Sequence, residues 1–219
     1  MKTLTILLLL FISGILSDNS FAQNTLKNIT IIKHQEYTTF FSTSLHYPIW
    51  VTWYETRAKV TCTTPLLRDN LFDKDPSLPN ETNLAKDYLD SGFDKGHNCP
   101  SKSNLCSGVG AARECFYYSN MTPQYHRVNA GSWENLERIC RTLAIQYDSI
   151  QIWCGSIGID KRIGRVAVPS QQWKVYHILR TNVYHAYIFN NNATDQGNGK
   201  NGIEIPIAQL TKLTGYSFK

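Results

Sequence analysis

The hydrophobic and polar positions of the chain follow two regular patterns, and the clearer one predicts a long helix. Over residues 133–147, apolar side chains recur at steps of three and four, as on one face of an amphipathic helix. Those positions are Trp133, Leu136, Cys140, Leu143, Ala144 and Tyr147. A shorter helix is expected after Pro206, through Leu210 and Leu213, with Gly215 at its end.

The second pattern predicts strands. Runs rich in β-branched and aromatic residues are separated by Gly, Pro or Asn, and they cover 152–154, 166–168, 173–179 and 183–189. Their order within a sheet does not follow from the sequence. The polar stretch 190–202, rich in Asn and Gly, is expected to be a surface loop between strands. Together the patterns indicate an α+β protein with a central, mainly antiparallel sheet and one long helix.

The first residues have the order of a secretory signal peptide. Lys2 precedes a mainly apolar run over 4–16, and Ser20-Phe21-Ala22 supplies small residues at the expected cleavage site. The alternative is a membrane anchor, but a spanning helix needs about 20 apolar residues and this run is shorter. We therefore expect cleavage after Ala22, and a secreted or periplasmic protein without stable membrane association.

Charge and length narrow the class of protein only slightly. The formal net charge is +5, and it survives cleavage because Lys2 and Asp18 are removed together. A mildly basic surface suits a polyanionic partner, although many secreted proteins share this property and charge alone decides little. The remaining length fits one domain with a substantial core, so residues 23–219 are expected to form a single domain.

The six cysteines all follow the expected cleavage site. They are Cys62, Cys99, Cys106, Cys115, Cys140 and Cys154. An even number in an oxidising compartment favours disulfides, and a zinc site is disfavoured because the chain has no CxxC pair and no His pair at ligand spacing. The pairing does not follow from the sequence. One local hypothesis is a Cys140–Cys154 bond between the long helix and the next strand.

Candidate catalytic groups lie in one stretch of the chain. Asp94-Lys95-Gly96-His97 is followed by residues 119–124 and then by 129–137, and the candidates among them are the imidazole of His97, the carboxamides of Asn120 and Asn129 and the carboxylate of Glu137. On the predicted helix, Glu137 lies about 40° from Trp133, at the edge of the apolar stripe. A carboxylate there needs a partner. Arg141 is one candidate, and a hydrated metal ion shared with Asn129 is the other.

These segments resemble the DNA/RNA non-specific endonuclease family, which includes mitochondrial endonuclease G and secreted bacterial nucleases. The resemblance rests on DKGH at 94–97, ECFYYSNMTPQ at 114–124 and NxGxWxxLE at 129–137. It extends from about Arg68 to residues 213–218 and covers most of the mature chain. Each motif is weak alone, but their ordered combination is specific. The resemblance implies a ββα-metal nuclease fold in which the long helix belongs to the active site.

The resemblance also implies a role for each candidate residue. His97 is expected to be the general base, Asn129 the protein ligand of Mg²⁺, with Mn²⁺ as a substitute, and Glu137 to hold water on that ion. Asn120 is expected to orient groups beside His97 or the phosphate. Three alternatives stay open: His97 as a turn residue, Asn129 as a helix cap, and Asn120 as a glycosylation site in Asn120-Met121-Thr122.

Two basic residues are expected to bind the substrate phosphate. Lys95 departs from the family pattern, in which arginine is usual, and lysine lacks the bidentate fork of a guanidinium. Arg68 resembles the family's upstream phosphate-binding arginine. The implied activity is hydrolysis of phosphodiester bonds in DNA and RNA to 5′-phosphate ends with little sequence selectivity. The oligomeric state stays open, a homodimer included.

Two other classes of function fit parts of the sequence. One is a catalytically inactive, nuclease-like domain that binds nucleic acid or a surface polymer, but the joint presence of His97, Asn129 and Glu137 argues against it. The other is an extracellular structural or adhesion domain held together by disulfides. That hypothesis explains the signal peptide and the cysteines, but it leaves the ordered polar cluster unexplained.

Overall fold

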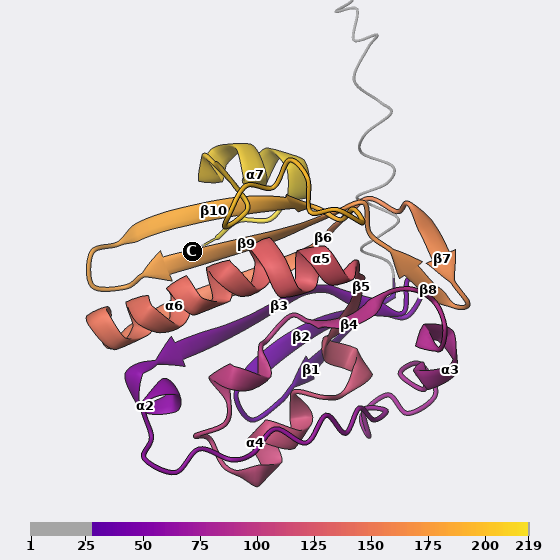
Figure 1. Ribbon diagram of the computed structural model, residues 1–219, viewed down its shortest axis with the longest axis horizontal. Coiled ribbons are helices and arrows are strands. Elements are labelled where there is room, and N and C mark those ends of the chain that lie inside the picture. Colours follow the sequence, from indigo (N-terminus) through magenta and orange to yellow (C-terminus); the bar gives the residue numbers. More distant parts are fainter. Residues whose placement is uncertain (1–27, 219) are drawn as a thin grey trace, which may run out of the picture.

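A seven-stranded antiparallel sheet forms the centre of the computed structural model, which describes residues 28–218 (Figure 1). The strand order is β1-β2-β3-β6-β9-β10-β11. These strands are β1 (Ile29–Lys33), β2 (Tyr37–Ser42), β3 (Tyr47–Thr56), β6 (Ser149–Ile157), β9 (Gln171–Ile178), β10 (Val183–Asn190) and β11 (Ile203–Ile205). The predicted signal peptide, residues 1–22, lies outside the described residues.

Two small antiparallel sheets and several helices complete the fold. The strand pairs are β4 (Asp94–His97) with β5 (Met121–Gln124), and β7 (Lys161–Ile163) with β8 (Val166–Val168). The helices are α2 (Arg57–Val60), α3 (Ala85–Tyr88), α4 (Val109–Glu114), α5 (His126–Val128), α6 (Glu134–Tyr147) and α7 (Ile207–Thr214). The pair β4–β5 and the helix α6 form the ββα unit that carries the candidate site.

Most of the elements predicted from the sequence are confirmed. The long helix is α6, the second helix is α7, and Gly215 ends α7 in the left-handed conformation with φ of 73°. The predicted runs lie in β6, β8, β9 and β10, and residues 191–202 connect β10 to β11. The predicted strands all lie in the second half of the chain, whereas β1, β2 and β3 in the first half belong to the same sheet.

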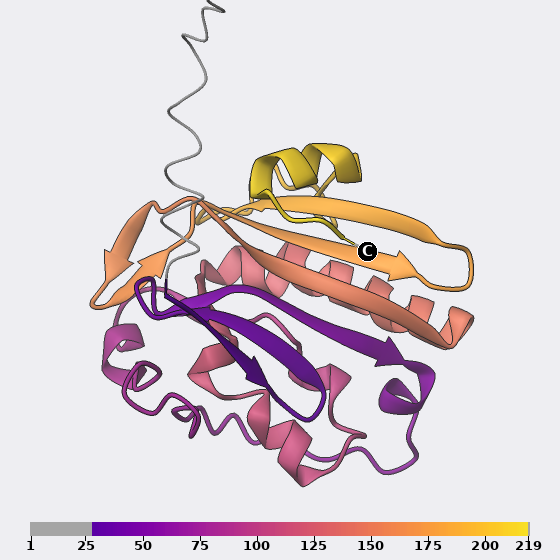
Figure 2. The same cartoon turned by 180° about the vertical axis from the view of Figure 1, so that it is seen from behind.

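Alternation along the strands gives the sheet two apolar faces. In β6, Ile152 packs in the cluster that contains Trp133 and Leu136, whereas its neighbour Trp153 packs in a second cluster with Leu210. Helix α6 therefore covers one face and α7 the opposite face, as the two views show (Figures 1 and 2). Side chains of the central strands that point toward α6 consequently reach the back of the candidate site.

A loop that is distant in sequence fixes the start of α6. The chain turns as a π-helix over Asn129–Trp133, and Gly131 departs from helical geometry with φ of −108° and ψ of −113°. Asp195 accepts hydrogen bonds from the Ser132 backbone N–H at 2.9 Å and from the Ser132 hydroxyl at 2.7 Å. A Cβ atom on Gly131 would lie 2.5 Å from Asp195 Oδ2. The surface loop thus caps the helix, and the cap requires a glycine.

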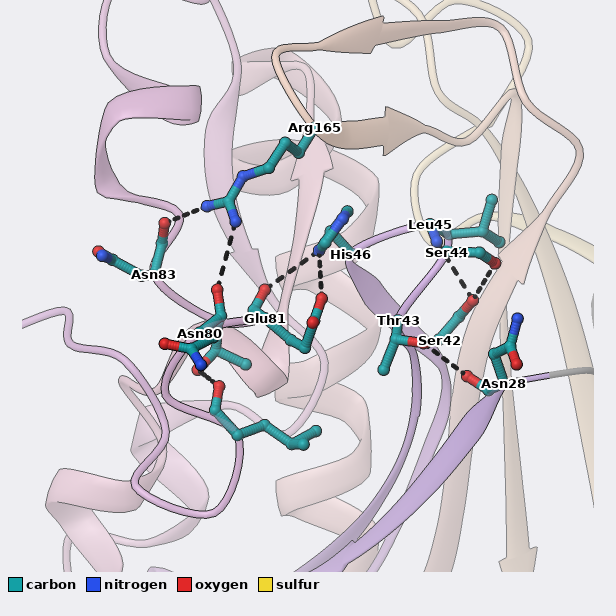
Figure 3. A network of polar contacts seen from close by, with 12 residues as sticks. Asn28, Ser42, Thr43, Ser44, Leu45, His46, Asn80, Glu81, Asn83 and Arg165 are labelled. Atoms are coloured by element: carbon teal, nitrogen blue, oxygen red, sulfur yellow. Dashed lines mark hydrogen bonds and ion pairs between the residues drawn. The ribbon is translucent and has the colours of Figure 1, made fainter.

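Polar contacts hold the long irregular segment between α2 and α3 against the β7–β8 hairpin and the β2–β3 turn (Figure 3). The Arg165 guanidinium, on the β7–β8 hairpin, donates to the backbone carbonyl of Asn80 at 3.2 Å and to that of Asn83. The imidazole of His46, at the β2–β3 turn, lies 3.2 Å from the carbonyl oxygen and 3.4 Å from the carboxylate of Glu81. These bonds replace the regular secondary structure that the segment lacks.

The expectation of disulfide bonding is confirmed for one pair, but the Cys140–Cys154 hypothesis was wrong. The disulfide joins Cys62 to Cys106, and the other four cysteines are buried free thiols. Cys140 on α6 and Cys154 on β6 pack among apolar side chains of one core cluster, so each serves as a small hydrophobic residue. Burial raises the pKa of both thiols to about 12, which disfavours the thiolate that disulfide exchange needs.

Within residues 28–218, no helix combines the length and the hydrophobicity needed to cross a bilayer.

Candidate active site

A polar cleft of about 210 Å³ lies between the β4 end, the start of α6 and the segment around Arg68. Its lining residues are Arg68, Lys95, His97, Pro100, Ser101, Lys102, Asn129, Ala130, Glu134 and Glu137. Five of the six residues predicted from the sequence thus line one cleft. Asn120 is the exception and does not line it. The predicted roles stay predictions, while the spatial grouping of five side chains follows from the fold.

The close pairing of β4 with β5 brings His97 into the cleft. His97 ends β4 opposite Met121, and Gly96 faces Thr122. A Cβ atom on Gly96 would lie 2.1 Å from Oε1 of Gln124, whose side chain is fully buried and cannot withdraw easily. Glycine at this position of the DKGH motif therefore makes room for the Gln124 side chain.

The surroundings of His97 keep its imidazole neutral. The ring contacts Phe116 edge-on at 5.1 Å between centroids and lies 5.6 Å from Phe72. Burial, and then the positive charge of Arg68, lower the pKa of His97 to about 3. Within the described part of the chain, its buried Nε2 atom has no hydrogen-bond partner. A neutral ring with an unpaired nitrogen suits a general base better than a turn residue.

The first residue of the DKGH motif orients Asn129. The Asn129 amide nitrogen donates to Asp94 Oδ2 at 2.8 Å, and Nδ1 of His126 lies 2.8 Å from the same oxygen. The amide nitrogen is thereby occupied. Among the described residues, Oδ1 of Asn129 accepts no hydrogen bond, so it is available as a ligand atom. Asn129 makes no side-chain capping bond to α6, since Asp195 performs that function.

Glu137 has two protein partners as well as a place in the cleft. Its Oε1 lies 3.5 Å from Nζ of Lys174 on β9, and its Oε2 lies 4.0 Å from the Arg141 guanidinium. Its side chain is 11% exposed, as expected for an edge position. Burial raises the pKa of Glu137, and the positive charges of Lys174 and then Arg141 oppose that effect. The sequence predicted Arg141 as a partner but missed Lys174.

Asn120 is a structural clamp below the cleft. Its amide oxygen accepts from the Cys99 backbone N–H at 2.9 Å, and its amide nitrogen donates to the carbonyls of Cys99 and Cys115, each at 2.9 Å. The residue is completely buried. It fixes the backbone two residues beyond His97, and its buried side chain exposes no surface to a phosphate or a glycan in the folded protein. The glycosylation alternative is therefore excluded for the folded chain.

The two predicted phosphate-binding residues lie over aromatic rings that also contact His97. Nζ of Lys95 is 4.9 Å from the centre of the Phe72 ring, and the Arg68 guanidinium carbon is 5.6 Å from that of Phe116. The Arg68 Nε also donates to Oδ1 of Asn70 at 2.7 Å. Both cations therefore stand beside the imidazole, held by weak contacts that leave donors available to a phosphate.

The sequence missed residues that support the site from behind. The Trp133 indole N–H donates to the His97 carbonyl at 3.2 Å, and the ammonium of Lys174 lies 3.8 Å from the centre of the Trp133 ring. Lys174 is completely buried. The sequence indicated Lys174 only as a single charged residue inside the apolar run 173–179.

The donor atoms fit a hard, hydrated divalent cation. Asn129 offers one neutral oxygen, and the carboxylates of Glu134 and Glu137 line the same cleft. Within residues 28–218, no group of three or more His, Cys, Asp or Glu side chains could hold a metal. Magnesium retains most of its water and needs few protein ligands, so a single amide oxygen with nearby carboxylates agrees with its chemistry.

Comparisons with known proteins identify the family. The family model described as DNA/RNA non-specific endonuclease matches residues 17–219. The chain belongs to this family. Nuclease C1 from Cunninghamella echinulata var. echinulata is 30% identical over 166 residues, which are 67% of this chain and 65% of that protein. The mitochondrial nuclease EXOG of Mus musculus is 29% identical over 168 residues, and the chain spans 45% of its length.

A solved structure supports the fold. The crystal structure of the EndoG/EndoGI complex, described as showing the mechanism of EndoG inhibition, matches with a TM-score of 0.74 and 21% identity. The match covers 94% of this chain and 93% of that chain. The predicted α+β, ββα-metal nuclease fold is confirmed.

Proposed function

We propose that the chain is a secreted endonuclease that hydrolyses phosphodiester bonds in DNA and RNA with Mg²⁺, for which Mn²⁺ can substitute. One observation carries the proposal: a neutral imidazole, an amide oxygen, two carboxylates and three cationic side chains line a single cleft. The family supplies the substrate class, and the nuclease names of its relatives agree with it. Products with 5′-phosphate ends belong to the same proposal.

His97 supplies the base. The neutral ring lines the cleft and accepts a proton from a water molecule that attacks the phosphorus. A pKa of about 3 keeps the ring unprotonated at neutral pH, but it also makes the free ring a weak base. A bound phosphate would offset the charge of Arg68, which is the second cause of the low pKa. Neutralising Arg68 in this way acts to raise the pKa of His97, while burial, the larger cause, still lowers it.

The other residues hold the phosphate and the ion. Lys95 and Arg68 neutralise negative charge on the non-bridging phosphate oxygens as it builds up. Asn129 would supply its Oδ1 to the cation, while Glu137 would accept hydrogen bonds from water in the ion's hydration shell. When bound, Mg²⁺ supplies Lewis-acid stabilisation of the pentacovalent phosphate and of the departing 3′-oxygen. Asn120 keeps the backbone beyond His97 in place.

Digestion of plasmid DNA and of RNA tests the activity. The wild-type protein with Mg²⁺ should degrade both substrates, EDTA should stop the reaction, and either Mg²⁺ or Mn²⁺ should restore it. The variant His97→Ala tests the base, and His185→Ala is its matched control. His185 pairs with Glu204 on the far part of the sheet, so it should not be needed for activity. Intact DNA and RNA after incubation with the wild-type protein and either cation would refute the enzyme hypothesis.

Export is a separate part of the proposal. The order Lys2, apolar run 4–16 and Ser20-Phe21-Ala22 supports removal of residues 1–22. Amino-terminal sequencing of protein recovered from the periplasm or the medium of an exporting host should begin at Gln23. An amino terminus at Met1, or retention in the membrane fraction, would contradict secretion while leaving the nuclease hypothesis intact.

A further inference from the structure

Lys174 is a lysine in a place where lysines are rarely found. It lies on β9, in the middle of the seven-stranded sheet, and its side chain is completely buried beneath α6. Its ammonium contacts one carboxylate oxygen, on Glu137 at 3.5 Å, and the face of Trp133 at 3.8 Å. Burying an ammonium is costly, and an apolar pair of similar volume often stabilises a fold as well or better. Packing alone therefore does not account for this residue.

The two partners of Lys174 lead to two different parts of the cleft. Glu137 is on the first turn of α6 and lines the cleft directly. Trp133 does not line it, but its indole N–H holds the carbonyl of His97 at 3.2 Å. One ammonium therefore contacts the helix that carries the carboxylate and, through the Trp133 ring, the strand end that carries the imidazole.

We propose that Lys174 is a positioning residue that holds Glu137 and the Trp133–His97 pair in a fixed relation from inside the core. This inference rests on the proposed function for its consequence in catalysis. Lys174 touches neither substrate nor metal, and it acts through the two side chains that it contacts. Arg141 cannot replace it, because Arg141 approaches the other oxygen of Glu137, at 4.0 Å, and is on the same helix rather than on the sheet.

The first test replaces the charge with an apolar side chain of similar length. In Lys174→Met, we expect a folded protein whose kcat falls about 10- to 100-fold while KM for DNA changes little, because Lys95 and Arg68 remain. Mg²⁺ affinity, measured by titration calorimetry without nucleic acid, should fall by a similar factor. Lys212→Met is the matched control, since Lys212 is exposed on α7 and both readings should stay at wild-type values.

A double-variant cycle tests whether Lys174 acts through Glu137. The kcat losses of Lys174→Met and Glu137→Gln should be less than additive in the double variant, because Glu137→Gln already removes the ion pair and only the contact of Lys174 with Trp133 remains to be lost. Additive losses would overturn a role through Glu137. A second variant, Trp133→Phe, keeps a ring for the ammonium but removes the bond to the His97 carbonyl, so it should lower kcat with less effect on Mg²⁺ affinity. Trp133→Phe also tests the positioning role if Lys174→Met fails to fold.

Crystal structures of the variants separate this inference from the proposed function. In Lys174→Met, the Glu137 carboxylate should leave its wild-type position in the cleft; in Trp133→Phe, the His97 backbone should shift. Unmoved side chains together with wild-type Mg²⁺ affinity would overturn the positioning role. If the wild-type protein cleaves neither DNA nor RNA, the nuclease proposal fails, but the positions of Glu137 and His97 in these structures still decide the role of Lys174.

Discussion

The two walls of the cleft are built in opposite ways. The wall formed by β4, the π-helix over Asn129–Trp133 and α6 carries His97, Asn129 and Glu137. Hydrogen bonds between β4 and the π-helix hold it, together with the ion pair from Lys174 on β9. The wall formed by residues 61–72 carries Arg68 and has no helix or strand of its own. Side chains such as Leu67, 94% exposed, extend from it into solvent, and the Cys62–Cys106 bond ties its start to the loop after β4.

This contrast assigns catalysis to the first wall and electrostatic binding of the phosphate to the second. A base and a metal ligand must lie within a fraction of an ångström of their working positions, which requires a supported backbone. A cation that neutralises a phosphate acts over a longer range and tolerates movement. We expect changes to the first wall to reduce turnover, and changes to the second to alter stability and substrate affinity.

The largest expected effect is chemical and falls on the supported wall. His97→Ala removes the base and should lower kcat about 10²- to 10⁴-fold. The melting temperature should fall only through the lost packing against Phe72 and Phe116, because the ring's Nε2 makes no bond in the described structure. Plasmid digestion with Mg²⁺, followed by calorimetric melting, measures both. Full activity in this variant would remove His97 from the mechanism.

The second prediction concerns the exposed wall. Replacing both Cys62 and Cys106 with serine releases a crosslink between residues 44 apart in sequence, which the chain-entropy model values at about 4 kcal/mol of unfolding free energy. Urea unfolding should show the loss. Turnover at low temperature should remain, while KM for DNA should rise as Arg68 becomes less confined. A loss of kcat without a change in KM would contradict the division between the walls.

The third prediction uses the pH dependence of stability. Between pH 6.5 and about 3, an unfolded chain protonates His97 but the folded chain does not. The unfolded state therefore binds more protons, and His97 lowers stability by up to about 1.4 kcal/mol for each unit that the pH falls in this window. His97→Gln should be less sensitive to acid than the wild type in urea titrations from pH 7 to 4. If the unfolding free energies of the wild type and of His97→Gln change equally with pH, the imidazole is solvated.

A smaller effect is expected where the chain departs from its family. Lys95→Arg gives the phosphate a bidentate partner, and the planar guanidinium can stack on Phe72 where the ammonium now lies at 4.9 Å. We expect kcat/KM for DNA to rise several-fold with no change in stability. Lys86→Arg, on the exposed face of α3, is the control for the same exchange. A fall in kcat/KM would show that Lys95 is better fitted to this cleft than arginine.

Sequence patterns predicted the parts of the molecule that depend on local periodicity. The repeat over 133–147 gave α6 because one face of that helix is buried, and Gly215 ended α7 because the left-handed conformation favours glycine. Residues 37–42 and 47–56 are rich in Thr, Tyr, Phe and Trp. Those strands were not predicted, although their composition favours β structure.

Contacts between distant segments could not be predicted in this way. Lys174 lies between Trp173 and Val175, so alternation predicts a polar position on one face of a strand. Alternation does not reveal that α6 covers that face. The prediction of the disulfide pairing failed for a similar reason. The short sequence separation favoured Cys140 with Cys154, whereas the fold brings Cys62 to Cys106. The family motifs located five cleft residues, but the partners behind them required coordinates.

The buried clamp of Asn120 also has a consequence for the synthesis of the protein. Asn120-Met121-Thr122 is a glycosylation sequence, yet all the hydrogen-bonding capacity observed at Asn120 is directed to the backbone of Cys99 and Cys115. A host that attaches glycans during translocation can therefore modify Asn120 only before the chain folds. The fraction of chains bearing a glycan at Asn120 would therefore report how quickly β5 packs against the segments around Cys99 and Cys115 during folding.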